Sequence, residues 1–317
     1  MGTGQWIDPE IAAVLASTVL PFAVLDDDNV GAVRRVQLDA AARVVPSAAV
    51  DRTDHTVPGP DGDPGVVLRV HRPVGLAGPA PCLYWIHGGG YVIGSYRTED
   101  LRLERLCLDL GCVAVAVDYR LAPETPYPGA LDDCSAGLRW VADHAGALGV
   151  DPTRLGVGGG SAGAGLAAAV ALAVRDGGQP PLAFQLLVYP MIDDRAVTRS
   201  SQWAAPVWTP ALNDYGWRSY LGARHGTADV PPTAAPARAG DLAGLPPAFV
   251  GVGSADLFVD EDIAYAQALL HAGVPTELHV YAGAVHGFET LTPDAAVAAR
   301  LRRDITDWLS RVMGVGP

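Results

Sequence analysis

Short apolar runs alternate with longer amphipathic segments from residue 82 to the end of the chain. Such a run is typical of a buried strand, and an amphipathic segment between two runs is typical of a connecting helix. The alternation therefore predicts βαβ units and a mainly parallel sheet. The predicted strands are 82–87, 112–118, 154–157, 183–189, 248–252 and 276–281, and the predicted helices lie near 99–110, 129–147, 162–175, 260–272 and 294–313.

The first part of the chain has a different pattern. One helix is predicted from Asp8-Pro9-Glu10 and a second after Asp28-Asn29. The second has a loose apolar face made of Val30, Val33, Val36, Leu38 and Ala41. Two extended segments, 49–57 and 66–74, follow on either side of the turn-rich stretch 58–65. We interpret them as an antiparallel edge pair, which brings the predicted strands to eight.

The alternation stops between Ile192 and Leu245, where aromatic residues stand among proline and alanine. We interpret this stretch as an insertion with a helix at 213–221. Its tryptophans, Trp203, Trp208 and Trp217, are expected to pack against the sheet. The alternative is that one or more of them line a substrate pocket, since such pockets are often aromatic.

Composition narrows the function. With 317 residues, 49% hydrophobic and 18% charged, the chain can bury a large core. A net charge of −13 argues against nucleic acid and anionic membranes as partners. All 22 basic residues are arginine, so mechanisms that need a lysine amine are excluded. Histidine is left as the available base.

The cysteines and the N-terminus suggest an ordinary intracellular chain. Cys82, Cys107, Cys112 and Cys134 lack CxxC spacing and are expected to be reduced packing residues. No basic residue precedes Arg34, and Pro21 interrupts the apolar stretch 11–25. Neither a signal peptide nor membrane insertion is predicted, so we expect a cytoplasmic protein.

The glycine-rich stretch 158–163 fits two motifs. Gly159, Ser161 and Gly163 match Gly-x-Ser-x-Gly, a strained strand-to-helix turn that carries a nucleophilic serine. The same stretch also matches the dinucleotide-binding pattern Gly-x-Gly-x-x-Gly. That pattern requires an acidic residue about 20 positions later at a strand end, but here residues 175–180 form a helix end. A nucleophile turn is favoured, and a purely structural glycine turn is the remaining alternative.

A serine nucleophile needs a base, an orienting carboxylate and N–H donors for the oxyanion. His286 follows the last predicted strand through a loop that can project its ring over the sheet, and is the favoured base. Asp256 follows the strand 248–252 by a short turn and is the favoured acid, with Asp260 in reserve. Asp260 itself is expected at a helix N-terminus.

The oxyanion hole is expected where His87-Gly88-Gly89-Gly90 follows a strand. Glycines there allow amides to face the site without a Cβ in the way. We expect the hole to comprise Gly88, Gly89, Gly90 and Ala162, with the N–H groups of the last three as donors. His87 is expected to support this loop rather than to act as a second base.

These motifs together resemble the bacterial esterases of the hormone-sensitive lipase family, within the α/β hydrolases. The matching stretches are HGGG (87–90), DYRLAPE (118–124), YPGALDD (127–133), GGSAG (159–163), DLFVDED (256–262) and HGF (286–288). They follow the family order and span about two thirds of the chain. One departure is Gly160, because the family commonly has aspartate or threonine before the serine.

The resemblance implies an α/β-hydrolase fold, with an eight-stranded, mostly parallel sheet flanked by helices and a helical cap. The cap would comprise residues 1–46 and 192–245, and the core 47–191 and 246–317. It also implies Ser161, Asp256 and His286 as a triad, supporting roles around the site for Arg120 and Glu124, and hydrolysis of short acyl esters. No metal or cofactor is implied.

The activity expected from these residues is that of a serine carboxylesterase with a small-molecule ester substrate. Lactonase, amidase and acyltransferase activities on the same triad stay open, as does a non-catalytic ligand receptor of the same fold. A homodimer is also possible.

Overall fold

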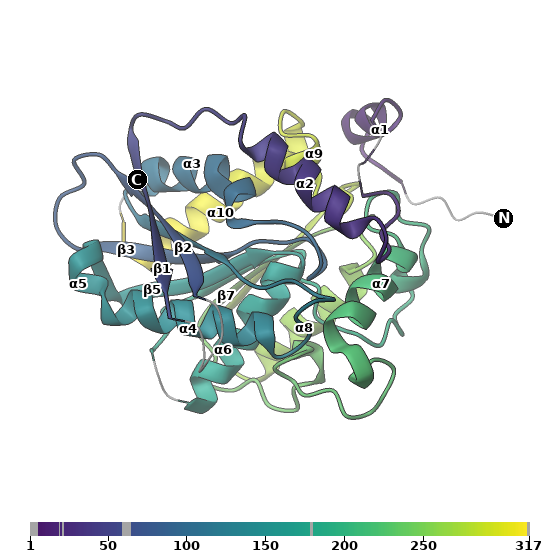
Figure 1. Ribbon diagram of the computed structural model, residues 1–317. Helices are drawn as coiled ribbons and strands as arrows, with labels where there is room; N and C mark the ends of the chain where they lie inside the picture. The colour runs from purple at the N-terminus through teal and green to yellow at the C-terminus, as the bar shows by residue number, and fades with distance from the viewer. Residues whose placement is uncertain (1–5, 19, 21, 59–64, 178–179, 316–317) are drawn as a thin grey trace.

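The computed structural model describes residues 6–18, 20, 22–58, 65–177 and 180–315. Its centre is one eight-stranded sheet in the order β1-β2-β4-β3-β5-β6-β7-β8 (Figure 1). The strands are Val50–Val57 (β1), Val66–Pro73 (β2), Ala80–Ile86 (β3), Val113–Asp118 (β4), Val150–Gly160 (β5), Gln185–Val188 (β6), Ala248–Gly253 (β7) and Thr276–Tyr281 (β8). β2 is antiparallel to β1 and β4, and the other neighbouring strands are parallel. The predicted mainly parallel sheet with an antiparallel edge pair is confirmed.

Helices cover both faces of this sheet (Figure 1). α3 (Asp100–Leu110) and α10 (Ala296–Met313) lie together on one face, and α4 (Gly129–Asp143), α6 (Ala162–Gly177) and α8 (Val259–His271) cover the other. Short helices are α5 (Ala145–Leu148), α9 (Phe288–Leu291) and the 3₁₀ turns η1 (Tyr96–Glu99), η2 (Ser200–Gln202), η3 (Gly222–Arg224) and η4 (Pro236–Arg238). Each face has its own buried apolar cluster. Burial on both faces explains why the central strands are continuous apolar runs.

Three predicted elements differ most from the structure. The insertion helix α7 (Pro210–Leu221) begins earlier than expected, because the Thr209 side chain caps it by accepting the N–H of Leu212 at 3.2 Å. The predicted helix 129–147 is divided at His144, so that histidine lies between α4 and α5 rather than within a helix. β5 starts at Val150, where it pairs with Ala80 across an irregularity in the register.

The N-terminal segment forms α1 (Pro9–Leu15) and α2 (Val30–Ala41), as expected, but the predicted apolar face of α2 is only partly buried. Val36 and Leu38 are 53% and 40% exposed. The helix is held here by polar contacts instead. Arg34 donates to the carbonyls of Val92 and Ala122, at 2.7 Å each. The spacing of apolar residues does not predict polar contacts of this kind.

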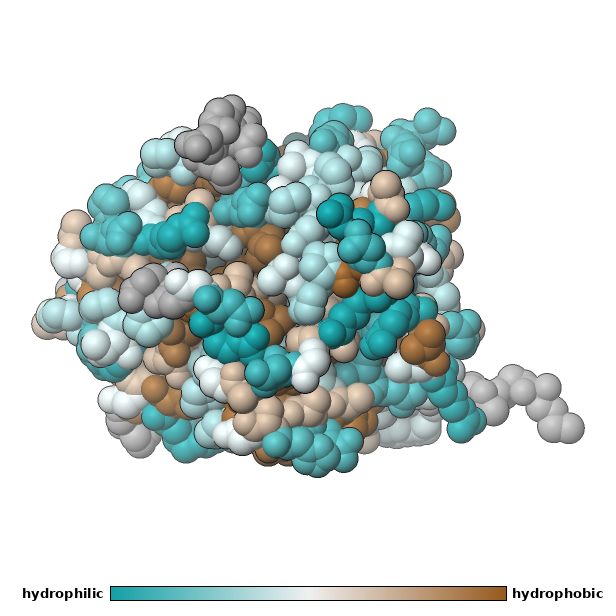
Figure 2. Space-filling view, turned by 90° about the horizontal axis from the view of Figure 1, so that it is seen from below, coloured by the Kyte–Doolittle hydropathy of each residue, from teal (hydrophilic) through white to brown (hydrophobic). Residues whose placement is uncertain are grey.

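The cysteines agree with the expectation of packing residues. The four cysteines are free and buried. Within the described ranges, no helix is both long and apolar enough to cross a membrane. On the face seen from below, hydrophobic side chains are interspersed among hydrophilic ones (Figure 2). Of the turn predicted at 58–65, residues 59–64 lie outside the described residues.

The first turn of α8 contains an unusual buried carboxylate. Asp260, Glu261 and Asp262 all stand at this helix N-terminus, where negative charge is favourable. Asp262, however, is fully buried, and neither of its carboxylate oxygens has a hydrogen-bond partner. Burial, followed by the nearby Glu261 and Asp256 carboxylates, raises the pKa of Asp262 well above its usual value.

This burial makes stability depend on pH. A carboxyl group whose folded-state pKa is raised contributes stability at low pH and loses it as the pH rises above its unfolded pKa of about 4. We therefore predict that Asp262→Asn increases the free energy of unfolding at pH 8 by at least about 1 kcal/mol, and that the gain shrinks toward about pH 4. Urea denaturation across this range measures it. Asp260→Asn is the control, because the Asp260 carboxylate already accepts the N–H of Ser200. It should not increase the free energy of unfolding. A gain that is equal at both pH values would contradict this account.

Candidate active site

Ser161 lies in a strained turn between the central strand β5 and helix α6. Its φ of +57° is a conformation that non-glycine residues rarely adopt. The turn fits only because Gly159 and Gly163 lack side chains. A Cβ on Gly159 would lie 2.3 Å from the carbonyl carbon of Gly163, and one on Gly163 would lie 2.1 Å from the carbonyl oxygen of Ile86. The glycines thus let α6 approach the ends of β3 and β5 closely.

The three residues expected to form a triad are hydrogen-bonded to one another. The Ser161 Oγ lies 2.8 Å from His286 Nε2, and His286 Nδ1 lies 2.7 Å from Asp256 Oδ2. Ser161 and His286 are each 7% exposed, and Asp256 is fully buried. The second Asp256 oxygen accepts the N–H of Phe258. This arrangement lets the imidazole take a proton from the hydroxyl while the carboxylate orients the ring.

The loops that carry the acid and the base are bonded to each other. Ser254 and Ala255 donate their N–H groups to the carbonyls of Tyr281 and Ala284, at 2.9 Å each, and Ser254 Oγ accepts the N–H of Gly283. A Cβ on Gly253 would lie 2.2 Å from the carbonyl oxygen of Ala284. A glycine at position 253 is therefore required by the close contact with the histidine loop.

The reserve acid Asp260 lies elsewhere. Its carboxylate accepts the N–H of Ser200 at 2.8 Å and so fastens η2 to α8. The other histidines are also separate from this group. For example, His71 is buried and bonds Asp100 at 2.9 Å, and His279 lies within β8.

The glycines that follow β3 line the same pocket as Ser161 and His286. Gly89 and Gly90 have φ angles of +120° and +59°, which favour glycine. The Gly89 carbonyl accepts the N–H groups of Val92 and Ile93, which holds the loop. Ala162 is the first residue of α6, and an N–H at this position has no partner within its own helix. The glycine loop therefore lies in the same pocket as Ser161 and His286.

His87 is placed as a support of this loop. Its Nδ1 donates to the Gly88 carbonyl at 2.8 Å, and its ring stacks on Tyr119 with centroids 4.2 Å apart. Burial lowers the pKa of His87, which favours the neutral ring. The structure does not join it to Ser161 or Asp256.

Neither Arg120 nor Glu124 lines the pocket of Ser161 and His286. Arg120 forms two side-chain hydrogen bonds with the fully buried Asp133, at 2.8 and 2.7 Å. Glu124 pairs with Arg34 at 2.8 Å and is well exposed. That pair fastens the N-terminal segment to the loop that follows β4.

The pocket over the triad has a volume of about 1120 Å³. The N-terminal segment contributes Phe22 and Gln37 to this pocket, and the insertion between Ile192 and Leu245 contributes Val207 and Trp208. Trp208 therefore lines the pocket over the triad. Trp217 does not; it packs on Tyr91 and lines a separate pocket beside α7. Close packing of Trp208 requires Gly90, where a Cβ would lie 2.3 Å from the indole ring.

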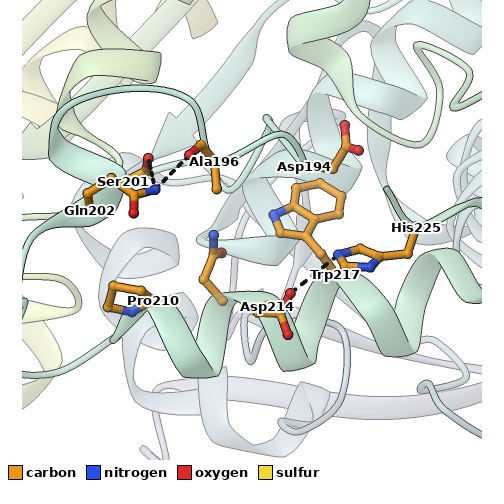
Figure 3. A pocket seen from close by; sticks show the side chains of 9 residues that line it. Asp194, Ala196, Ser201, Gln202, Pro210, Asp214, Trp217 and His225 are labelled. Carbon is orange, nitrogen blue, oxygen red and sulfur yellow. Dashed lines mark hydrogen bonds and ion pairs between the residues drawn. The ribbon is translucent and has the colours of Figure 1, made fainter. Parts of the chain in front are cut away.

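A second pocket of about 210 Å³ lies beside α7 (Figure 3). Asp214 and His225 approach to 3.6 Å at its edge. It shares no lining residue with the Ser161 pocket. Across the described part of the chain, no group of three or more His, Cys, Asp or Glu side chains could hold a metal ion.

Sequence reasoning missed two residues of the larger pocket, Tyr189 and Glu289. Tyr189 ends the predicted strand 183–189, and side chains at the carboxyl ends of parallel strands face the ligand crevice. The position of Tyr189 at a strand end could therefore have identified it as a pocket residue. Glu289 follows His286 by three residues, but nothing in the sequence indicates that its side chain turns inward.

The comparisons with known proteins agree with this geometry. A family model described as the alpha/beta hydrolase fold matches residues 83–290. The carboxylesterase NlhH of Mycobacterium tuberculosis is 36% identical over 299 residues, 92% of each chain. The esterase LipI of the same organism is 37% identical over 287 residues, which cover 89% of this chain and 88% of that protein. A solved bacterial heroin esterase has a TM-score of 0.91 and 39% identity over 97% of this chain and 98% of its own.

The surroundings of Gly160 generate a prediction about the nucleophile turn. A Cβ on Gly160 would meet nothing closer than 3.6 Å, whereas one on Gly159 would lie 2.3 Å from backbone. We predict that Gly160→Ala keeps the fold and retains activity within about threefold, because ordinary van der Waals contacts result. Gly159→Ala should lower the melting temperature and nearly abolish activity. Thermal unfolding and ester hydrolysis measure both. Equal behaviour of the two variants would show that backbone proximity does not limit this turn.

Proposed function

The chain belongs to the hormone-sensitive lipase family of α/β hydrolases and is a serine carboxylic ester hydrolase, and we propose that it hydrolyses short-chain acyl esters through Ser161, His286 and Asp256. The observation that carries the proposal is the buried hydrogen-bonded series from Asp256 through His286 to Ser161. The names of the similar proteins, carboxylesterase and esterase, support the same reaction.

The first half of the reaction forms an acyl-enzyme. His286 Nε2 takes the hydroxyl proton as Ser161 Oγ attacks the ester carbonyl carbon. The carbonyl oxygen becomes an oxyanion, for which we propose the N–H groups of Gly89, Gly90 and Ala162 as donors. When the tetrahedral intermediate collapses, the imidazolium gives its proton to the departing alkoxide, and the alcohol leaves. The acyl group stays on Ser161.

The second half repeats these steps with water. His286 removes a proton from a water molecule, which attacks the acyl carbon and forms a second tetrahedral intermediate. Its collapse returns the proton to Ser161 Oγ and releases the carboxylic acid. Asp256 keeps the imidazole oriented and stabilises its charged form in both halves. Its burial is tolerated because both oxygens are bonded.

The direct test is loss of the nucleophile. We expect Ser161→Ala to lower kcat for p-nitrophenyl butyrate by about three orders of magnitude or more, since the residual rate depends on binding and the oxyanion donors alone. A labelled organophosphonate should become attached to the wild-type protein at Ser161, as measured by mass spectrometry, and should not label the variant. A folded Ser161→Ala protein with near-normal turnover would refute the assignment. A panel of esters, lactones and anilides identifies the preferred bond.

The place of Trp208 in the pocket leads to a prediction about acyl length. Its ring lies near His286, with centroids 6.2 Å apart, and against Gly90, so it limits the space beside the reacting carbonyl. We predict that Trp208→Ala raises the ratio of kcat/KM for p-nitrophenyl octanoate over acetate by about tenfold, because new apolar space accepts further methylene groups.

The matched control is Trp203→Ala, since Trp203 lies in the same segment but does not line the pocket. It should leave the ratio unchanged. If both variants shift the ratio equally, the effect comes from loosening the segment and the role given to Trp208 is wrong.

A further inference from the structure

Tyr189 stands beside the triad in a strained conformation. It directly follows β6 and has a φ of +38°, which a non-glycine residue rarely adopts without support from its surroundings. The residue is 5% exposed, and its ring meets the His286 ring at 63° with centroids 4.7 Å apart. The triad as described does not use it.

The hydroxyl of Tyr189 is held by a buried carboxylate. It donates to Glu289 Oε1 at 2.5 Å, and the same oxygen accepts a hydrogen bond from Arg102 at 2.8 Å. Arg102 also bonds Glu99, at 3.1 Å, and Glu99 accepts the indole N–H of Trp85 at 2.9 Å. One chain of polar contacts therefore connects the ends of β6 and β3 with α9 and α3.

The protonation states in this series of hydrogen bonds determine which group donates each hydrogen bond. Burial, reinforced by the Glu289 carboxylate, raises the pKa of Tyr189 well above its usual value, so the phenol keeps its proton. Burial would lower the pKa of Arg102, but Glu289 and Glu99 together raise it above its usual value. The guanidinium thus stays charged and compensates the Glu289 side chain, which is only 4% exposed.

This series of hydrogen bonds acts on the loop that holds the base, His286. Glu289 follows His286 by three residues in α9, so its bond to Tyr189 ties the end of the histidine loop to β6. β6 pairs with β5, the nucleophile strand, and the Ser161 N–H donates to the Val188 carbonyl just before Tyr189. The same connection therefore fixes the base relative to the nucleophile.

We propose that Tyr189 and Glu289 form a positioning pair that holds the His286 imidazole between Asp256 and Ser161 while it carries the proton. The proposal rests on the proposed function, because it concerns the same proton transfer. Neither residue reacts. The pair acts through the Tyr189 ring, which packs edge-on against the His286 ring and limits its rotation.

Gly160 fits this arrangement. A Cβ at this position would lie 3.6 Å from Tyr189 Cε2 and 3.8 Å from its hydroxyl oxygen. A polar side chain before the nucleophile would therefore reach the hydroxyl and compete with Glu289 for it. The glycine leaves Tyr189 available to the glutamate, which gives a physical meaning to the departure from the family pattern.

The test separates positioning from folding by using two conservative variants. Tyr189→Phe keeps the ring and removes the hydrogen bond, and Glu289→Gln keeps an acceptor and removes the charge. Each should lower kcat for p-nitrophenyl butyrate by about tenfold with KM changed less than about twofold, because a slightly misplaced base slows proton transfer rather than binding. The double variant should be little worse than Tyr189→Phe alone, since Tyr189→Phe removes the hydrogen bond that Glu289→Gln weakens.

The pH profile of kcat/KM adds a readout that a purely structural role would not move. The charged groups linked to His286 are Asp256, which bonds its Nδ1, and Glu289, Arg102 and Glu99, which are linked in series to the Tyr189 hydroxyl. Glu289→Gln removes one negative charge from this set and so disfavours the imidazolium. The acid limb of the kcat/KM profile of Glu289→Gln should therefore move to lower pH. The limb of Tyr189→Phe should stay near that of the wild type, because the charge remains.

Tyr281→Phe is the matched control. It removes another hydrogen bond from a buried tyrosine to a carboxylate, that of Tyr281 to Asp304 at 2.8 Å, without a contact to the His286 ring. It should retain wild-type kcat. Wild-type kcat in both test variants, additive losses in the double variant or an equal loss in Tyr281→Phe would overturn the proposal. If Tyr189→Phe does not fold, the acid limb of Glu289→Gln decides. Absence of Ser161-dependent hydrolysis in the wild type would instead refute the proposed function.

Discussion

The rest of the site depends on the contact between backbone segments at the nucleophile turn. Ser161 can project from the end of β5 only because Gly159 and Gly163 allow α6 to begin directly against the ends of β3 and β5. The strained φ of the serine is maintained by this packing and by the pairing of β5 with strands on both sides. A turn at an edge of the sheet would have only half of that support.

The order of the strands then supplies the remaining parts in sequence across the sheet. β3, on one side of β5, leads into the glycine loop, and β6, on the other side, leads into Tyr189. β7 and β8 follow and carry the loops of Asp256 and His286. Because these strands are parallel, all of these loops emerge at one end of the sheet. Residues that are more than a hundred positions apart, such as Ser161 and His286, meet there.

The buried carboxylates of this protein differ in whether they have hydrogen-bond donors. Asp256 and Asp133 have donors for both carboxylate oxygens, from His286 and Phe258 and from Arg120. Glu289 has donors for one oxygen, from Tyr189 and Arg102. Asp262 has no such donor, and its raised pKa reflects that difference. The protein thus tolerates buried charge where a partner exists and carries a pH-dependent cost where none does. Two of the partnered carboxylates are joined to the histidine loop: Asp256 bonds His286, and Glu289 follows His286 by three residues.

The sequence by itself determined the elements and the triad candidates, because both depend on local patterns. Apolar runs defined the parallel strands, and short motifs after strand ends identified Ser161, Asp256 and His286. The start of α7 was also encoded locally, by Thr209 and Pro210, although it was placed too late. Only the tertiary structure decided which side chains meet. The inward turn of Glu289, its bond to Tyr189 and the place of Trp208 over Gly90 depend on packing between segments distant in the chain. Periodicity within one segment contains no information about such contacts, because it records which face is buried and not what lies against it.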